Sequence, residues 1–188
     1  MKRLAILTVG KTHSGKTTFA RELERRLPES AVIDRDDLAE FINTHYESLL
    51  PKHGENTLKD ALTRTIVDYA VHETEQHIIM CNANSNREGR LRMLDWFHQK
   101  GLVSVLVYFN LPDDVLYSRV ASSQRSTAIL RKSNSFDVVL TRQIADSQKG
   151  LAEPPTESES EHLFVINDSD EVPGTIQKIV QIAGGKSI

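Results

Sequence analysis

The stretch Gly10-Lys11-Thr12-His13-Ser14-Gly15-Lys16-Thr17 fits the pattern G-x-x-x-x-G-K-[ST]. This pattern forms a phosphate-binding loop when it follows a strand and opens a helix. An apolar run from Leu4 to Val9 precedes it, and one apolar helix face extends after it from Phe19 to Leu27 and stops at Pro28. The sequence therefore supplies the context that the motif requires, and a glycine turn without a ligand is the weaker alternative.

The loop residues have separate roles in binding a nucleoside triphosphate. Glycines let backbone N–H groups converge on phosphate oxygens, and the helix N-terminus adds positive potential. We expect Lys16 to contact the β and γ phosphates of ATP, and Thr17 to offer its hydroxyl to Mg²⁺. His13 stands at a variable position, so its side chain is expected to be incidental. The predicted nucleotide-binding residues are Gly10, Lys11, Thr12, His13, Ser14, Gly15, Lys16, Thr17 and Thr18.

Beyond the loop, apolar β-branched runs alternate with amphipathic stretches. Each run is continuously hydrophobic, as expected for a parallel sheet that is buried on both faces. Five strands are predicted, at Leu4–Val9, Ala31–Ile33, His77–Cys81, Leu102–Phe109 and Leu163–Ile166. Further helices are predicted at about residues 37–45, 58–70, 87–100, 112–122, 136–149 and 174–183. The alternation predicts an α/β fold.

The second predicted strand leads into a cluster of acids, Asp34-Arg35-Asp36-Asp37. In open α/β sheets, ligands lie beyond the carboxyl ends of the strands, so at least one of these carboxylates should face the phosphate loop. Phosphoryl transfer to an alcohol needs a carboxylate that takes the hydroxyl proton, and an acid near Mg²⁺ that holds a metal-bound water. The cluster can supply both. The alternative is that Asp36 or Asp37 only caps the next helix.

A basic segment lies later in the chain. Between Val115 and Phe136 there is no acidic residue, but there are four basic ones, Arg119, Arg125, Arg131 and Lys132. Guanidinium groups bind phosphate bidentately and stay charged, so the segment is typical of a lid that closes on a triphosphate. The alternative is a solvated helix face.

Three other features have less specific interpretations. The stretch GLAEPPTESESE at residues 150–161 is polar and acidic and is predicted to be a loop. Arg87 and Arg90 follow the third strand, where they either meet an acceptor phosphate or form salt bridges. Cys81 is expected to be a small buried hydrophobic residue.

Composition excludes several classes of protein. The chain of 188 residues has 26 acidic and 23 basic side chains and a net charge of −3, which argues against an extended basic surface around duplex nucleic acid but not against contact with a nucleic-acid end. Cys81 is the only cysteine, so no internal disulfide forms, and no apolar run is long enough to cross a membrane. We expect one domain, residues 1–188, in the cytoplasm.

The motifs together resemble a family of small P-loop kinases. This family includes AAA-type ATP-binding proteins, zeta-toxin-like proteins and the kinase domain of bacteriophage polynucleotide kinase. The resemblance rests on the phosphate loop, on Asp34-Arg35-Asp36-Asp37-Leu38, on Cys81-Asn82-Ala83-Asn84-Ser85-Asn86-Arg87-Glu88-Gly89-Arg90 and, more loosely, on Leu111-Pro112, Arg119, Arg125 and Glu153-Pro154-Pro155. It implies a three-layer α/β P-loop fold with five parallel strands in the order 2-3-1-4-5, and an arginine-bearing lid at about residues 119–136.

The resemblance also implies roles for single residues. The first aspartate of the family's R-D-D turn activates the acceptor hydroxyl, which places that role on Asp36. Arg119 and Arg125 match the lid arginines that contact the donor phosphates in the transition state. With Lys16, these residues form the predicted catalytic set.

The sequence departs from the family pattern at two positions. Asn82 stands where the family usually has an acid, so the outer shell of the metal would depend on Asp34 or Asp36, and Thr17 and Asp34 are the predicted metal residues. Ala39 stands where the polynucleotide kinase has an arginine that touches the acceptor's phosphate.

These observations lead to one main hypothesis and two alternatives. The main hypothesis is a Mg²⁺-dependent kinase that transfers the γ-phosphoryl group of ATP to a hydroxyl of a small molecule. Mild acidity and Ala39 make the first alternative, a kinase for the 5′-hydroxyl end of a nucleic acid, less favoured. The second alternative, motivated by Asn82, is a nucleotide-binding switch with little turnover. A membrane partner is not expected.

Overall fold

The computed structural model describes residues 2–54, 56–130 and 135–185. Five strands form one sheet in the order β2-β3-β1-β4-β5, and all neighbouring strands are parallel. The strands are β1 (Leu4–Val9), β2 (Ser30–Asp34), β3 (His77–Cys81), β4 (Val103–Phe109) and β5 (His162–Ile166). The predicted α/β P-loop fold and its strand order are confirmed.

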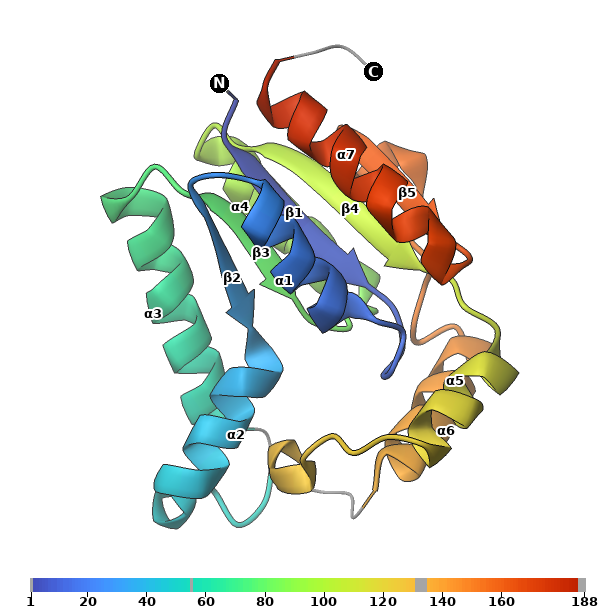
Figure 1. Ribbon diagram of the computed structural model, residues 1–188. Helices are drawn as coiled ribbons and strands as arrows, with labels where there is room; N and C mark the ends of the chain where they lie inside the picture. Colours follow the sequence, from blue (N-terminus) through green and yellow to red (C-terminus); the bar gives the residue numbers. More distant parts are fainter. Residues whose placement is uncertain (1, 55, 131–134, 186–188) are drawn as a thin grey trace.

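Helices cover both faces of the sheet, with α1 and α7 on one face and α3 and α4 on the other (Figure 1). The α-helices are α1 (Lys16–Arg26), α2 (Arg35–His45), α3 (Thr57–Glu73), α4 (Arg87–Gln99), α5 (Asp113–Ala121), α6 (Phe136–Gln148) and α7 (Val172–Ala183). Short 3₁₀ helices lie at η1 (Glu47–Leu49), η2 (Thr127–Ile129), η3 (Glu157–Glu159) and η4 (Ser169–Glu171). Among the described residues, no helix is both long enough and apolar enough to span a membrane.

The central strand β1 explains why the predicted strands are continuously apolar. Every residue of β1 is buried. Leu4 and Ile6 pack on the side of α1 and α7, whereas Ala5 and Leu7 pack on the side of α3 and α4. Because side chains alternate between the two faces and both faces are covered, neither face of the strand can be polar.

Some element boundaries differ from the predicted ones. Helix α2 begins at Arg35 rather than near Asp37, because the Asp34 side chain accepts the Asp36 N–H and caps the helix. Pro112 lies just before α5, at its cap, rather than in its first turn. The acidic stretch 150–161 is not only a loop, because it contains η3 and a buried carboxylate, Glu159.

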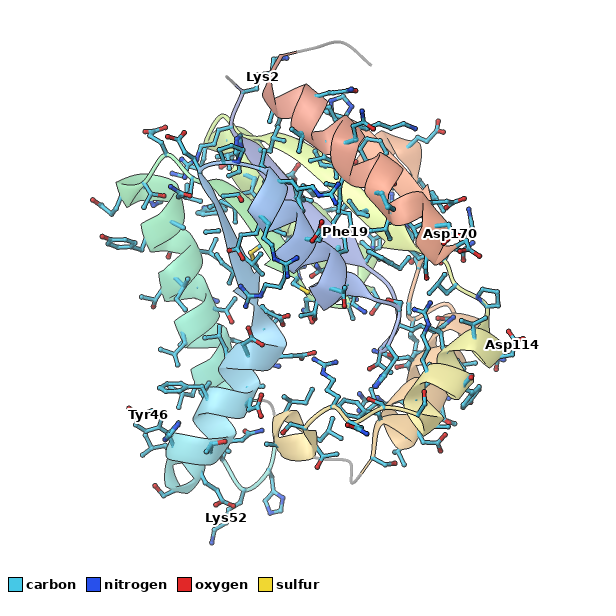
Figure 2. All side chains as sticks on the ribbon, viewed as in Figure 1. Lys2, Phe19, Tyr46, Lys52, Asp114 and Asp170 are labelled. Atoms are coloured by element: carbon cyan, nitrogen blue, oxygen red, sulfur yellow. The ribbon has the colours of Figure 1, made fainter. Side chains whose placement is uncertain are left out.

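Four elements gather beyond the carboxyl ends of the strands. Helix α2 lies on one side, α5 and α6 lie on the other, and η2 connects the two sides (Figure 1). Asn43 Nδ2 of α2 donates to the Ala128 carbonyl of η2 at 2.7 Å. Tyr46 and Lys52, at the far end of α2 and in the loop after it, extend outward from the molecule (Figure 2). The space between the sheet and these elements holds the candidate site.

Candidate active site

The phosphate loop joins β1 to α1 in a conformation that requires glycine. Gly10 has a φ of 145°, and a Cβ there would lie 2.9 Å from the Phe109 carbonyl oxygen. Gly15, immediately before α1, has a φ of 97°. The Gly10 N–H donates to the Ala83 carbonyl at 3.0 Å, which fixes the loop to the segment after β3. This arrangement places the N-terminus of α1 at the loop, where it can bind an anion.

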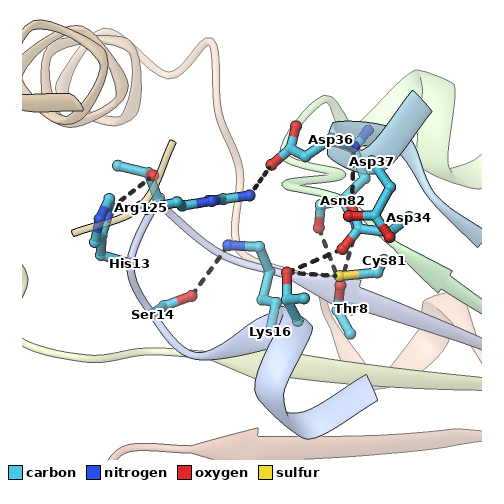
Figure 3. Close-up of polar contacts among 12 residues, drawn as sticks. Thr8, His13, Ser14, Lys16, Asp34, Asp36, Asp37, Cys81, Asn82 and Arg125 are labelled. Carbon is cyan, nitrogen blue, oxygen red and sulfur yellow. Dashed lines mark hydrogen bonds and ion pairs between the residues drawn. The ribbon is translucent and has the colours of Figure 1, made fainter. Parts of the chain in front are cut away.

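The Lys16 ammonium lies along the loop. It donates to the Lys11 carbonyl and, at 3.1 Å, to Ser14 Oγ (Figure 3). Burial lowers the pKa of Lys16 from 10.5 to about 8, against the opposing effects of Cys81, Asp36 and Asp34. A partly buried cation whose described hydrogen-bond acceptors are all neutral is suited to an incoming phosphate.

Thr17 and Asp34 lie together at the start of α1 and the end of β2. Thr17 Oγ1 donates to Asp34 Oδ2 at 2.9 Å, and Asp34 is 4% exposed. A hydroxyl and a carboxylate fit Mg²⁺, which is usually held by one or two protein oxygens together with substrate phosphates. In the described part of the chain, no group of three or more His, Cys, Asp or Glu side chains could hold a metal by itself.

Asp36 and Asp37 do not cap α2, because Asp34 does. Asp37 forms an ion pair with Arg21 at 2.6 Å on the surface. Asp36 instead forms an ion pair with Arg125 at 2.8 Å, and Figure 3 shows Arg125 extending to it from the opposite side of the site. The alternative role that the sequence left open for Asp36 is therefore wrong, and its carboxylate is available at the cavity.

Arg119 and Arg125 both lie at the site. Arg119 donates to the His13 carbonyl at 3.3 Å and to Ser169 Oγ at 2.8 Å. The Arg125 guanidinium lies 5.3 Å from the centre of the Phe136 ring. Both arginines therefore face the cavity rather than a solvated helix face. Arg131 and Lys132, the other basic residues of the predicted lid, lie outside the described residues.

The interpretation of His13 as incidental is wrong. Its Nε2 lies 2.8 Å from Ser123 Oγ, and its ring packs edge-on against Phe136 at 4.7 Å. Burial lowers the pKa of His13, as do the positive charges of Arg125, Lys16 and Arg119, and all four effects favour the neutral ring. His13 thus connects the phosphate loop to the segment that carries Arg125. No local signal could reveal this, because Ser123 is 110 residues away in sequence.

The segment after β3 is hydrogen-bonded to the end of β1, next to the phosphate loop. Thr8 Oγ1 donates to the Asn82 carbonyl at 3.0 Å, and Asn82 lines the cavity. Arg90 is buried and forms an ion pair with Glu159 at 2.7 Å, so it forms a salt bridge rather than a contact for an acceptor phosphate. Cys81 is buried as expected, and burial raises its pKa to about 12.

The predicted residues meet at a cavity of about 1210 Å³, which is large enough for a nucleotide and a second molecule. Gly10 and Lys11 instead line a smaller cavity of about 200 Å³ on the other side of the loop. The larger cavity is lined by most of the predicted site residues, namely Thr12, His13, Gly15, Lys16, Thr17, Thr18, Asp34, Asp36, Arg119 and Arg125.

Comparisons with known proteins agree with this fold. A family model described as an AAA domain matches residues 6–154. No curated protein sequence gives a significant match.

Three solved structures are similar over nearly their whole length. A proposed kinase from Chloroflexus aurantiacus J-10-fl is 19% identical, with 100% of both chains covered and a TM-score of 0.61. The shikimate kinase of Bacteroides thetaiotaomicron is 17% identical, with 96% of this chain and 98% of that chain covered and a TM-score of 0.55. The Mycobacterium tuberculosis APS kinase CysC, in complex with AMPPNP and APS, is 15% identical, with 97% and 98% covered and a TM-score of 0.58. At these identities the likeness shows the fold alone.

Proposed function

The chain belongs to the AAA domain family, and from this premise we propose that it is a Mg²⁺-dependent phosphotransferase that moves the γ-phosphoryl group of ATP to a hydroxyl of a small molecule. The observation that carries the proposal is the meeting of Lys16, Asp36 and Arg125 at one cavity. Among the residues that the structure describes, the Asp36 carboxylate caps no helix and its ion-pair partner is Arg125, at 2.8 Å. A phosphate-binding cation, a carboxylate that can take a proton and an arginine that can turn to the phosphates are the groups that this reaction needs.

The donor half of the cavity would hold ATP. The N–H groups at the start of α1 and the Lys16 ammonium bind the phosphates, and Arg119 and Arg125 neutralise charge that develops on the transferred group. Thr17 and Asp34 would hold Mg²⁺, which supplies further neutralisation of the phosphate charge when it is bound. Because ATP is the donor, we place the reaction in the cytoplasm.

The acceptor half would place a hydroxyl against Asp36. The Asp36 carboxylate takes the hydroxyl proton as the acceptor oxygen bonds to the γ phosphorus. The bond from that phosphorus to the β–γ bridging oxygen breaks, and ADP leaves with its electron pair. The ion pair of Asp36 with Arg125 opens first, so that Arg125 turns to the phosphates and Asp36 to the hydroxyl.

The outer end of the cavity supports a small acceptor. The hydrogen bond from Asn43 to the Ala128 carbonyl joins α2 to η2 across that end. Ala39 is 5% exposed and offers no charge to a polynucleotide phosphate. We infer from these two features that a small molecule is the better acceptor.

The direct test is transfer of radiolabelled γ-phosphate from ATP with Mg²⁺. The acceptors are a pooled small-molecule extract and, in parallel, an oligonucleotide with a 5′-hydroxyl end. We expect label in the extract, and a loss of about 100-fold or more in Lys16→Ala and Asp36→Asn. Asp37→Asn is the matched control, because the neighbouring Asp37 carboxylate is engaged with Arg21 on the surface. Label that persists in Asp36→Asn would contradict the proposal, and label only in the oligonucleotide would change the acceptor class.

A nucleotide-binding switch with little turnover is the second candidate. Asn82 brings no negative charge to the site, and Asp36 is occupied by Arg125. Tight ATP binding without label in any acceptor would favour this candidate.

A further inference from the structure

The cavity continues past Asp36 to a second group of cations. Arg35, in the first turn of α2, and Lys59, in the first turn of α3, both line it. Asp36 influences the pKa of Lys16 on one side and that of Lys59 on the other, so it lies within electrostatic reach of both. Neither Arg35 nor Lys59 has a part in binding ATP as described above.

Arg35 has an unused hydrogen-bond donor. Its Nη2 forms an ion pair with Asp60, whereas its Nε is buried and has no hydrogen-bond partner among the residues that the structure describes. A buried N–H of a charged group that lacks a partner is costly, and such groups are rare in folded proteins. A guanidinium commonly binds an anion through two N–H groups at once, so Arg35 has the capacity for one more oxygen ligand.

Lys59 carries a charge that nothing in the described chain balances directly. Its ammonium forms no hydrogen bond or ion pair with the residues described, although its side chain is partly buried. Burial lowers the pKa of Lys59, and the positive charge of Arg35 lowers it further, against the opposing effects of Asp36 and Asp60. These two carboxylates are already paired, Asp36 with Arg125 and Asp60 with Arg35. In the described part of this cluster, the three cations Arg35, Lys59 and Arg125 therefore face the two carboxylates.

We propose that Arg35 and Lys59 form an anion subsite for the acceptor, so that the acceptor is an alcohol that also carries a carboxylate or phosphate group. The inference rests on the proposed phosphotransferase function and specifies its substrate class. The anion would satisfy the Arg35 Nε and balance the Lys59 charge, and thereby hold the acceptor beside Asp36. Lysine and arginine bind carboxylate and phosphate alike, so the two anions share this chemistry.

The first test is binding of an anion after the phosphate loop is filled. Protein saturated with Mg²⁺ and AMPPNP is titrated calorimetrically with inorganic phosphate in one arm and with glycerate in the other. We expect one saturable site per chain in at least one arm, and the stronger arm identifies the anion. Lys59→Met should weaken binding of this anion about tenfold or more, because a charged contact is lost. Lys59→Arg should bind the anion nearly as tightly as wild type.

A matched control separates this effect from general charge removal. Lys178 is exposed on α7, away from the cavity, so Lys178→Met should leave both titrations unchanged. Neither Lys59 variant removes a hydrogen bond that supports the fold, so both should unfold at the wild-type temperature. The inference would be overturned if neither anion bound to the AMPPNP-saturated protein, or if Lys59→Met bound the anion as tightly as wild type.

A second test distinguishes failure of the inference from failure of the proposed function. The extract is divided on an anion exchanger before the labelled transfer reaction, into a retained anionic pool and an unretained pool. Label in the anionic pool that is reduced by Lys59→Met supports the subsite. Label only in the unretained pool, lost in Asp36→Asn, would overturn the subsite and leave the phosphotransferase intact. Label in neither pool, despite AMPPNP binding, would overturn both.

Discussion

Two arginine–carboxylate pairs in this molecule have the same chemistry and different surroundings. Arg90 and Glu159 are 0% and 1% exposed, and their side chains are joined by two hydrogen bonds, at 2.7 and 3.1 Å. Arg125 and Asp36 are 33% and 43% exposed and are joined by one, at 2.8 Å. The first pair lies between α4 and the segment before β5, whereas the second crosses the cavity.

The difference shows what each pair can do. Separating a buried pair leaves a buried charge that neither water nor a partner stabilises, so the Arg90–Glu159 pair is expected to stay closed. Arg90 also donates to the Asn84 carbonyl at 2.8 Å, and Asn84 Nδ2 donates to the Thr8 carbonyl, so the buried pair holds the segment beneath the phosphate loop. An ion pair that is partly open to solvent contributes little to stability. We propose that Arg125 and Asp36 separate, so that Arg125 serves the phosphates and Asp36 the acceptor.

The largest effect should come from removing the cavity arginine. Arg125→Ala should lower kcat for phosphoryl transfer about a thousandfold, as for other arginines that stabilise a transferring phosphoryl group. The unfolding free energy of this variant should change by less than about 1 kcal/mol, because water reaches both side chains of the pair. Single-turnover transfer and urea unfolding provide the two values, with the exposed α3 variant Arg64→Ala as control. A large loss of stability in Arg125→Ala would contradict the proposed difference between the Arg125–Asp36 pair and the buried Arg90–Glu159 pair.

The buried arginine should show the opposite pattern. Arg90→Met should lower the unfolding free energy by about 3 kcal/mol or more, because Glu159 would remain buried without its main partner. Arg87 also contacts Glu159, at 3.3 Å, but is 44% exposed. Arg87→Met should therefore cost less than about 1 kcal/mol in the same urea unfolding experiment. Equal losses in the two variants would show that burial does not set the strength of this cluster.

Alkaline pH should weaken the binding of ATP in the cavity. The Lys16 pKa of about 8 in the free protein rises when phosphates bind, so ATP binding takes up a proton above that pH. ATP affinity should be constant below about pH 8 and fall up to about tenfold per unit above it. Calorimetric titration from pH 7 to 10 checks this, and Lys16→Met should bind weakly without the pH dependence. A pH-independent wild-type affinity would contradict the assignment.

Acidic pH should reduce the contribution of the buried Arg90–Glu159 pair to stability. Burial alone would raise the pKa of Glu159, but the hydrogen bonds and charge of Arg90 lower it below 4.5. This contribution to stability is present above pH 4.5 and is lost as the pH falls through the lower folded-state pKa. Wild type should lose more unfolding free energy than Glu159→Gln between pH 5 and 3 in urea unfolding. If the unfolding free energies of the two proteins changed equally with pH, the lowered pKa of Glu159 would be contradicted.

The sequence was sufficient for the fold because its signals are local. The apolar run of β1 and the spacing of Gly10, Gly15 and Lys16 each lie within a few residues, and the strand order follows from the family resemblance. The position of Asp36 just after β2, at the carboxyl edge of the sheet, could also be predicted, because parallel strands direct their carboxyl ends to one edge.

The partners of the charged side chains could not be predicted. Glu159 is 69 residues from Arg90, and its polar surroundings in sequence are typical of a loop. Arg35 and Asp60 are separated by 25 residues, and Ser123 and His13 by 110. Such pairings depend on where whole helices pack, and no local pattern encodes them.

The central claim is that Asp36 serves the acceptor and only restrains Arg125 until ATP arrives. The most direct measurement is ATP affinity and transfer rate together, in wild type and Asp36→Asn. Without its partner, Arg125 is free for phosphate, so ATP should bind at least as tightly as to wild type and up to about fivefold more tightly, while transfer falls about 100-fold or more. A parallel loss of affinity and transfer, or transfer at the wild-type rate, would contradict the account.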